Sequence, residues 1–178
     1  DAVEVPWPLT GRDEELRRIA AAIRPGAAGI VVAGSAGVGK TRLAREALAV
    51  PGGRGATVVW ALGSTAARPL PLGAFAGMFD VPPGDPAETI GRVLDQLARQ
   101  QRLVLAVDDA HLLDQHSAIV LHRVVIRRLA PVVVTLRTGD LQRATGAAHG
   151  PVVLLHLQPG PRGCGERSRP VISGKLCA

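Results

Sequence analysis

A glycine-rich octapeptide holds most of the residues whose types and spacing suit chemistry on a ligand. It reads Gly34-Ser35-Ala36-Gly37-Val38-Gly39-Lys40-Thr41 and matches the pattern G-x-x-x-x-G-K-[ST]. Glycines let backbone N–H groups approach phosphate oxygens closely, and a helix that follows adds the positive end of its dipole. In this pattern Lys40 reaches the β- and γ-phosphates, and the Thr41 hydroxyl binds magnesium. All eight residues are predicted to bind a nucleoside triphosphate, with Lys40 also catalytic.

The alternative interpretation is a glycine-rich turn that matches the pattern by accident. However, Lys40 is one of only two lysines in the chain, and it stands where the pattern requires a lysine. The flanks also fit, because Gly29–Ala33 is a short apolar run typical of a strand and Thr41–Val50 is helical by pattern. A phosphate-binding loop between a strand and a helix is the better hypothesis.

Two adjacent carboxylates follow a second apolar run. Leu103–Val107 is uninterrupted, as is typical of strands buried on both faces, and Asp108-Asp109 come directly after it. Asp108 is predicted to hold magnesium together with Thr41. Asp109 is the candidate to orient or deprotonate the attacking water, although many phosphate-loop ATPases have Glu there. The alternative is an ordinary Asp-Asp turn, which would be preferred without the upstream loop.

One more strand, Thr57–Leu62, is inserted along the chain between the loop strand and the Asp-Asp strand. This favours the class of phosphate-loop ATPases that has an additional strand between those two. Val132–Leu136 is then expected beside the Asp-Asp strand, with Thr135, Arg137 or Thr138 near the γ-phosphate. We choose Arg137, because a guanidinium at a strand end can stabilise charge on the transferring phosphoryl group. The alternative is a solvated arginine in a loop.

Strands and helices alternate along the rest of the chain. Three more helices are predicted: one from Asp13 that ends at Pro25-Gly26, one over 87–100 and one over Ile119–Leu129. A further strand is predicted over Val152–Leu157. Residues 63–86 are expected to be irregular apart from a turn near Phe75–Phe79. The fold class is therefore α/β, a three-layer phosphate-loop NTPase with a parallel sheet of about five strands. Residues 1–158 are expected to form this domain, and 159–178 a divergent basic tail that is disordered.

Composition excludes several other classes of protein. The net charge is +6, but half of it falls in residues 161–178, and the chain has only two Phe, two Trp and no Tyr for stacking on bases. We therefore expect no direct binding of DNA. No apolar run has the roughly 20 residues that a membrane span needs, so a cytoplasmic protein is predicted. The five His and two Cys show no ligand spacing that suggests zinc.

Four segments together carry a family resemblance. They are Thr10–Leu16 (T-G-R-D-E-E-L), Gly34–Thr41, Val107–Asp114 (V-D-D-A-H-L-L-D) and Val134–Arg137. In this order, over about residues 5–158, they resemble the ATPase domain of signal-transduction ATPases, the AAA+-related switches of large LuxR-type bacterial transcriptional regulators. The resemblance implies a weakly hydrolysing switch that binds ATP and Mg²⁺. It also places Gly11 and Arg12 near the adenine and makes Arg137 the sensor arginine.

The C-terminal residues depart from that family. Its members continue with a helical lid, a sensor region and a helix-turn-helix, whereas Leu155–Pro159 only begins like that junction and Gly160–Ala178 differs entirely. We therefore expect a truncated regulator, a fragment of one or a separate small ATPase, without lid or DNA-reading helix. Whether it hydrolyses ATP stays open. Its expected partners are copies of the chain or full-length regulators. The alternative hypothesis is a non-enzymatic remnant that acts by association with full-length relatives.

Overall fold

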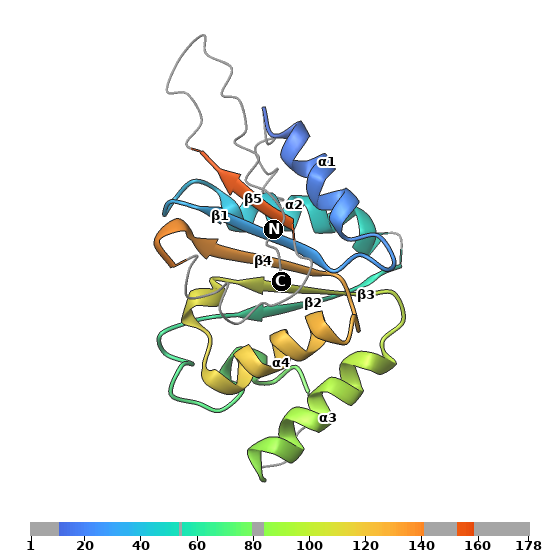
Figure 1. Ribbon diagram of the computed structural model, residues 1–178, viewed down its shortest axis with the longest axis vertical. Helices are drawn as coiled ribbons and strands as arrows, with labels where there is room; N and C mark the ends of the chain where they lie inside the picture. Colours follow the sequence, from blue (N-terminus) through green and yellow to red (C-terminus); the bar gives the residue numbers. More distant parts are fainter. Residues whose placement is uncertain (1–10, 54, 80–83, 141–152, 159–178) are drawn as a thin grey trace, which may run out of the picture.

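A single parallel sheet organises the chain. The computed structural model describes residues 11–53, 55–79, 84–140 and 153–158. Its strands are β1 (Gly29–Gly34), β2 (Thr57–Leu62), β3 (Leu103–Asp108), β4 (Val132–Arg137) and β5 (Val153–Leu157). They lie in the order β2-β3-β4-β1-β5, and every neighbouring pair is parallel. All carboxyl ends therefore meet at one edge of the sheet, on the left in Figure 1.

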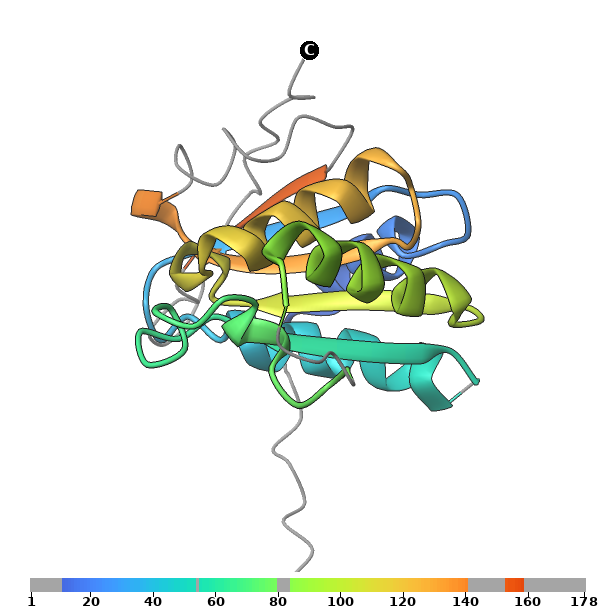
Figure 2. The same ribbon diagram turned by 90° about the horizontal axis from the view of Figure 1, so that it is seen from below.

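Helices cover both faces of the sheet (Figures 1 and 2). The helices are α1 (Asp13–Ala22), α2 (Lys40–Gly53), α3 (Pro86–Arg99) and α4 (Gln115–Ile126), and short 3₁₀ turns follow at η1 (Gly73–Phe75), η2 (Ala110–Leu112) and η3 (Thr138–Asp140). On one face, Ile19 of α1 and Leu43 of α2 pack with sheet residues into one buried cluster. On the other, Leu97 of α3 and Val120 of α4 belong to a second cluster. The predicted three-layer α/β fold is confirmed.

The predicted additional strand is also confirmed. β4 lies between β1 and β3, hydrogen-bonded to both. Thr57–Leu62, the strand inserted in the chain between the loop strand and the Asp-Asp strand, is β2 and lies at the edge of the sheet beyond β3. β3 is buried along its whole length, as its apolar sequence indicated, whereas four residues of β2 are only half-buried.

Helix α2 ends later than predicted, and helix α4 both begins and ends earlier, at Gln115 and Ile126. Pro51 was expected to end α2 near Val50, but the helix continues to Gly53. A proline lacks one N–H, and in the last turn this removes only one hydrogen bond; the Pro51 carbonyl accepts the N–H of Ala56 at 3.0 Å. α4 begins at Gln115, four residues before the predicted start, because the Asp114 carboxylate caps it.

Some predictions fall outside the described residues. The tail after residue 158 is one of them, so the domain boundary predicted there stays a prediction. Among the described residues, no helix is both long and apolar enough to cross a membrane. In the stretch after β2, where no long element was predicted, the described residues 63–79 and 84–85 hold the short turn η1 and no longer element.

Candidate nucleotide-binding site

The glycine-rich loop lies between β1 and α2, at the carboxyl edge of the sheet. Gly37 and Gly39 have φ angles of 75° and 91°, in the left-handed region that favours glycine. A Cβ on Gly34 would lie 2.8 Å from Val38 Cγ1 and 3.1 Å from the Leu157 carbonyl oxygen. Gly34 therefore allows the loop to leave β1 directly against the end of β5, while Gly37 and Gly39 allow its turn.

Lys40 begins α2 and is 7% exposed. Its Nζ donates a hydrogen bond to the Ser35 carbonyl at 2.9 Å, across the loop. An ammonium group that is buried needs oxygen partners, and this carbonyl supplies one. The contact holds the charge of Lys40 inside the loop, where phosphate oxygens are expected.

Thr41 and Asp108 are 67 residues apart in sequence and in direct contact in the fold. The Thr41 hydroxyl donates to Asp108 Oδ1 at 2.9 Å. The hydroxyl of Thr135, on β4, donates to the same oxygen and accepts the backbone N–H of Asp109 at 3.0 Å. Asp108 is 6% exposed and Thr135 is 1% exposed. Two hydroxyls from two elements thus orient one buried carboxylate beside the loop.

Thr135 was weighed from the sequence as one of three residues near the γ-phosphate, which stays a prediction. Its hydroxyl is bonded to Asp108, the predicted magnesium ligand. The pattern of a strand with one polar residue at an inward-facing position was the indication of such a role.

Asp109 occupies a strained backbone conformation, with φ 49° and ψ 50°. Left-handed conformations are costly for residues other than glycine and concentrate at functional sites. Its side chain is 36% exposed, and Oδ1 lies 3.9 Å from Nδ1 of His111. The carboxylate of Asp109 is therefore more accessible than that of Asp108, as the predicted roles require.

His111 is a residue that sequence reasoning missed. Its side chain is 8% exposed, and Nε2 lies 4.0 Å from Oδ2 of Asp140, in η3 after β4. Nδ1 is buried without a hydrogen-bond partner among the described residues. The imidazole thus lies between the carboxylates of Asp109 and Asp140, and links the turn after β3 to the turn after β4. The spacing of the histidines in the sequence does not suggest a metal site, so His111 was set aside.

Arg137 is the last residue of β4 and pairs in register with Gly34, the first residue of the loop. Its side chain is exposed, and it forms no ion pair with any described residue. The fold therefore puts Arg137 at the strand end beside the loop, as predicted.

Arg12 joins the start of α1 to the end of β5. Its guanidinium contacts Glu15 Oε1 at 2.9 Å and the Gln158 carbonyl at 3.0 Å. Gly11, before it, has a φ of 74°. β5 runs beside β1, with Leu157 opposite Gly34, so this junction lies next to the loop. The adenine contact of Gly11 and Arg12 stays a prediction.

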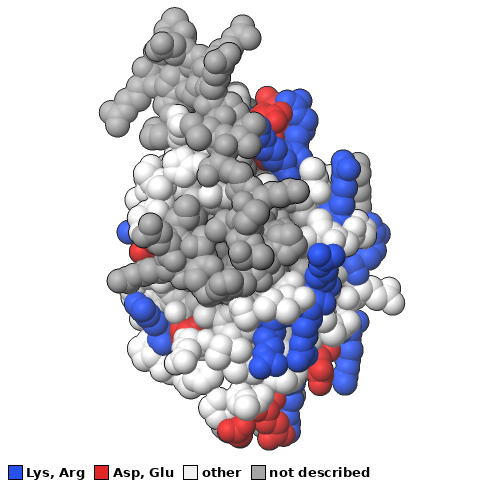
Figure 3. All heavy atoms as spheres, in the orientation of Figure 1, with Lys and Arg blue, Asp and Glu red and all other residues white. Residues whose placement is uncertain are grey.

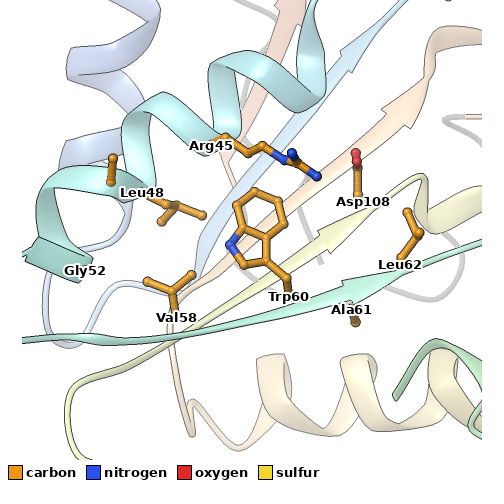
Figure 4. Close-up of a pocket in the computed structure, with 9 residues that line it drawn as sticks. Arg45, Leu48, Gly52, Val58, Trp60, Ala61, Leu62 and Asp108 are labelled. Atoms are coloured by element: carbon orange, nitrogen blue, oxygen red, sulfur yellow. The ribbon is translucent and has the colours of Figure 1, made fainter. Parts of the chain in front are cut away.

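A pocket of about 350 Å³ opens between α2 and the edge strand β2 (Figure 4). The Arg45 guanidinium lies over the Trp60 ring, 5.8 Å from its centroid, and points toward Asp108 in Figure 4. Leu48 and Val58 line the opposite end. No sequence pattern indicated this pocket, because its residues come from α2, β2 and the end of β3 and share no motif.

The connection after β2 is attached to the turn after β3 at two points. The Gly63 N–H donates to the Asp108 carbonyl at 2.9 Å, and a Cβ on Gly63 would lie 2.3 Å from the Asp109 carbonyl oxygen. Further on, the Leu72 N–H donates to Asp114 Oδ1 at 3.1 Å. The acidic turn therefore cannot shift without displacing this connection.

Asp114 is a buried carboxylate with hydrogen bonds on both oxygens. Oδ1 accepts the N–H groups of Leu72, His116 and Ser117, and Oδ2 accepts the Ser117 hydroxyl. Burial acts to raise the pKa of this carboxyl, but the hydrogen bonds outweigh burial and hold the pKa below its ordinary value of 3.8. Asp114 is thus ionised and fixes the start of α4.

Comparisons with known proteins agree with this fold. Residues 8–83 match the family model of the AAA ATPase domain, which includes the loop but ends before Asp108. AMPPCP-bound DnaA from Aquifex aeolicus is similar in structure, with a TM-score of 0.51 and 16% identity over 82% of this chain and 43% of that one. S. cerevisiae Hsp104, in its casein complex, has a TM-score of 0.60 and 18% identity over 86% of this chain and 28% of that one. No curated protein matches the chain.

The fold and the loop define the class of protein. The chain has the α/β fold of the phosphate-loop NTPases, with five parallel strands and alternating helices. Residues 8–83 are similar to the AAA ATPase domain, and the fold as a whole is similar to that of DnaA and Hsp104. The chain spans 43% of the DnaA chain and 28% of the Hsp104 chain, so the likeness concerns one domain of those proteins.

Proposed function

We propose that this domain binds ATP with Mg²⁺ and works as a weakly hydrolysing nucleotide switch. The observation that carries the proposal is the contact between Thr41 and Asp108, at 2.9 Å. A hydroxyl at the start of the helix after a phosphate loop and a strand-end Asp are the pair that holds magnesium in phosphate-loop NTPases. The similarity of residues 8–83 to the AAA ATPase domain supports the same ligand.

The residues present fit a magnesium ion. Mg²⁺ prefers oxygen ligands and keeps several waters, so one hydroxyl and one carboxylate suffice from the protein. Asp108 already accepts two hydroxyl donors and forms no ion pair with any described residue, although the Arg45 guanidinium points toward it. Thr41 and Asp108 would hold the ion, which would neutralise charge on the β- and γ-phosphates. Lys40 would exchange its contact with the Ser35 carbonyl for phosphate oxygens.

Hydrolysis is assigned to the turns after β3 and β4. Asp109 would accept a proton from the attacking water or orient it, and Arg137 would stabilise charge on the transferring group. His111 would position Asp109, because its ring separates that carboxylate from Asp140. The left-handed φ of Asp109 supports a functional role for its side chain, because such costly backbone conformations concentrate at functional sites.

The finer assignment is to the ATPase module of LuxR-type regulators. It rests on the four segments named above, of which G-R-D-E-E-L and D-D-A-H-L-L-D are the more specific. The contacts of Arg12 with Glu15 and of Asp114 with Leu72 give both segments structural roles in this fold. In such a switch the nucleotide sets the conformation of the segments that follow Asp109 and Arg137.

Titration with a fluorescent ATP analogue tests the proposal. Wild type should bind in the presence of Mg²⁺, and Lys40→Ala should lose most of the affinity, because the charge that faces the phosphates is removed. Asp108→Asn should weaken binding only when Mg²⁺ is present. Arg17→Ala, whose side chain is 73% exposed on α1, is the matched control and should bind like wild type. Equal binding by wild type and Lys40→Ala would reject the site.

A further inference from the structure

Arg45 points along the pocket between α2 and β2 toward Asp108 (Figure 4). It follows Thr41 by one turn of α2, so the two side chains lie on the same side of the helix. The Thr41 hydroxyl contacts Asp108 Oδ1 at 2.9 Å. The guanidinium of Arg45 is therefore directed at the same carboxylate from the next turn of the helix.

The Trp60 ring holds the guanidinium in this direction. Cζ of Arg45 lies 5.8 Å from the ring centroid, within the range of a cation–π contact. Trp60 is itself half-buried and packs against the cluster that contains Leu43 and Leu48. The arginine side chain thus lies against a fixed aromatic wall, with its charge at the end of the pocket near Asp108.

Ion pairs with other acidic residues do not account for the direction of Arg45. Over α1, where Figure 3 shows blue side chains beside red ones, Arg17 and Arg18 both pair with Glu14. Arg45, by contrast, forms no ion pair with any residue that the structure describes. No other acidic side chain is therefore paired with the guanidinium that faces Asp108.

The helix dipole does not account for Arg45 either. The residue lies in the first half of α2, whose first turn contains no acidic residue. The N-terminal end of a helix favours negative charge, so a cation gains nothing from the dipole there. Lys40, the other cation at this end of α2 that faces the site, is held by the Ser35 carbonyl. Asp108 is the negative charge that Arg45 faces.

One oxygen of Asp108 is available to a cation. Oδ1 accepts the hydroxyls of Thr41 and Thr135, whereas Oδ2 accepts no hydrogen bond from the part of the chain that the structure describes. The residue is 6% exposed, and it lines the same pocket as Arg45. A buried charge is costly unless an opposite charge lies near it. Arg45 supplies that opposite charge from the pocket.

We propose that Arg45 is the counter-ion of Asp108 while no magnesium is bound, and that it sets how strongly ATP binding depends on Mg²⁺. The inference rests on the proposed function, in which Thr41 and Asp108 hold the ion beside the phosphates. Arg45 acts through Asp108 in this role, so it is a positioning residue and not a phosphate ligand.

The charge of Arg45 acts in opposite directions with and without the ion. Without Mg²⁺, Asp108 repels the triphosphate, and Arg45 offsets that repulsion. With Mg²⁺, Arg45 and the ion face one carboxylate and repel each other, so Arg45 lowers the affinity for the ion. Both effects reduce the magnesium factor, which we define as the ratio of ATP affinity with Mg²⁺ to ATP affinity without it. A phosphate ligand would instead raise ATP affinity under both conditions.

Titration of the whole chain with a fluorescent ATP analogue, once with Mg²⁺ and once with EDTA, measures the magnesium factor. The variant is Arg45→Met, which keeps an unbranched apolar side chain against Trp60 and removes the charge. We expect the magnesium factor to rise about tenfold, the scale of unit charges several ångströms apart near a protein surface. Salt at about 0.5 M should shrink this difference, because it screens the charges.

Two control variants separate the charge at this place from other effects. Arg45→Lys keeps a positive charge, and its magnesium factor should stay near that of wild type. Arg42→Met removes a charge from an exposed position on the same helix that does not line the pocket. Solvent and salt screen such a charge, so the magnesium factor should change less than about threefold.

Binding of Mn²⁺, used as a substitute for Mg²⁺, tests the same point without nucleotide. Electron paramagnetic resonance measures the free ion, and Arg45→Met should bind Mn²⁺ about tenfold more tightly than wild type. Three results would overturn the role of Arg45: an unchanged magnesium factor in Arg45→Met, an equal rise in Arg42→Met, or equal losses of ATP affinity with and without Mg²⁺. If wild type bound no ATP analogue, the proposed function would fail instead, and the Mn²⁺ titration would still decide whether Arg45 opposes an ion at Asp108.

Discussion

The hydroxyl of Thr135 donates a hydrogen bond to the carboxylate of Asp108. The same hydroxyl accepts the backbone N–H of Asp109, so one side chain of β4 fixes both acidic residues. Thr135→Val keeps the shape but leaves that N–H unpaired and the carboxylate with one donor fewer. We expect magnesium-dependent ATP affinity to fall about tenfold, which corresponds to roughly the 1–3 kcal/mol of a lost hydrogen bond to a charged group.

Thr135→Ser is the matched control for this prediction. It retains the hydroxyl and removes one methyl group, so ATP affinity should stay near that of wild type. Titration with a fluorescent ATP analogue, with and without Mg²⁺, measures both variants. If Thr135→Val binds Mg-ATP as tightly as Thr135→Ser, the hydroxyl has no part in holding Asp108.

His111 should affect turnover more than binding. Its ring lies 3.9 Å from Asp109 and 4.0 Å from Asp140, but no described contact joins it to the loop that holds the phosphates. His111→Phe keeps a flat aromatic ring, although a somewhat larger one, and removes both nitrogens. If Asp109 loses its position, we expect ATP turnover to fall by about 10- to 100-fold, the scale of a small misplacement of a reacting group.

The measurements for His111 are steady-state phosphate release and the dissociation constant of the ATP analogue. The dissociation constant should change less than about threefold. His122→Phe, on α4 and away from the acidic turn, serves as the control and should leave both quantities unchanged. A loss of binding that parallels the loss of turnover would assign His111 to the fold of the site as a whole.

The place of Lys40 in the site could be predicted from the sequence, whereas that of His111 could not. Lys40, Thr41 and Asp108 stand in motifs whose chemistry depends on local spacing, so their places at one sheet edge followed from the order of strands and helices. His111, Thr135 and the Arg45–Trp60 pocket depend on which elements become neighbours, and no short pattern records that.

Helix ends were also predicted incompletely. The start of α4 was missed because the apolar pattern begins only at Ile119, although Asp114 caps the helix through the N–H groups of His116 and Ser117. The end of α2 was missed because proline is costly within a helix but tolerated in its last turn. The apolar pattern predicted that these helices exist, whereas a cap and a tolerated proline set these two boundaries.

Asp114 should make the stability of the domain depend on pH in a defined direction. Its pKa in the folded chain lies below 3.8, so the unfolded chain binds this proton first as the pH falls. The stabilisation is therefore complete above about pH 4 and is lost as the pH drops through the folded pKa. Asp114→Asn removes this titration, and we expect its free energy of unfolding to approach that of wild type between pH 5 and pH 3.

Asp114→Ala is the stronger variant at the same position. It removes the cap of α4 and leaves the Leu72 N–H unpaired, which together should cost about 2–4 kcal/mol at neutral pH. Urea unfolding of wild type and both variants at each pH gives the comparison. A constant difference between wild type and Asp114→Asn across this range would show that the carboxylate is not the titrating group.

Gly63 should couple the acidic turn to the connection after β2. A Cβ there would meet the Asp109 carbonyl oxygen at 2.3 Å and the Asp108 carbonyl oxygen at 3.2 Å, so Gly63→Ala must push this turn away from β2. Backbone shifts of this kind typically cost about 1–3 kcal/mol. We expect a lower melting temperature together with lower ATP turnover, since Asp109 moves with its carbonyl.

Gly91→Ala, in α3 with nothing within 4 Å of the added Cβ, is the control and should raise stability by about 0.5–1 kcal/mol. Thermal unfolding and phosphate release on both variants decide the matter, and normal turnover in Gly63→Ala would mean that Asp109 tolerates the shift.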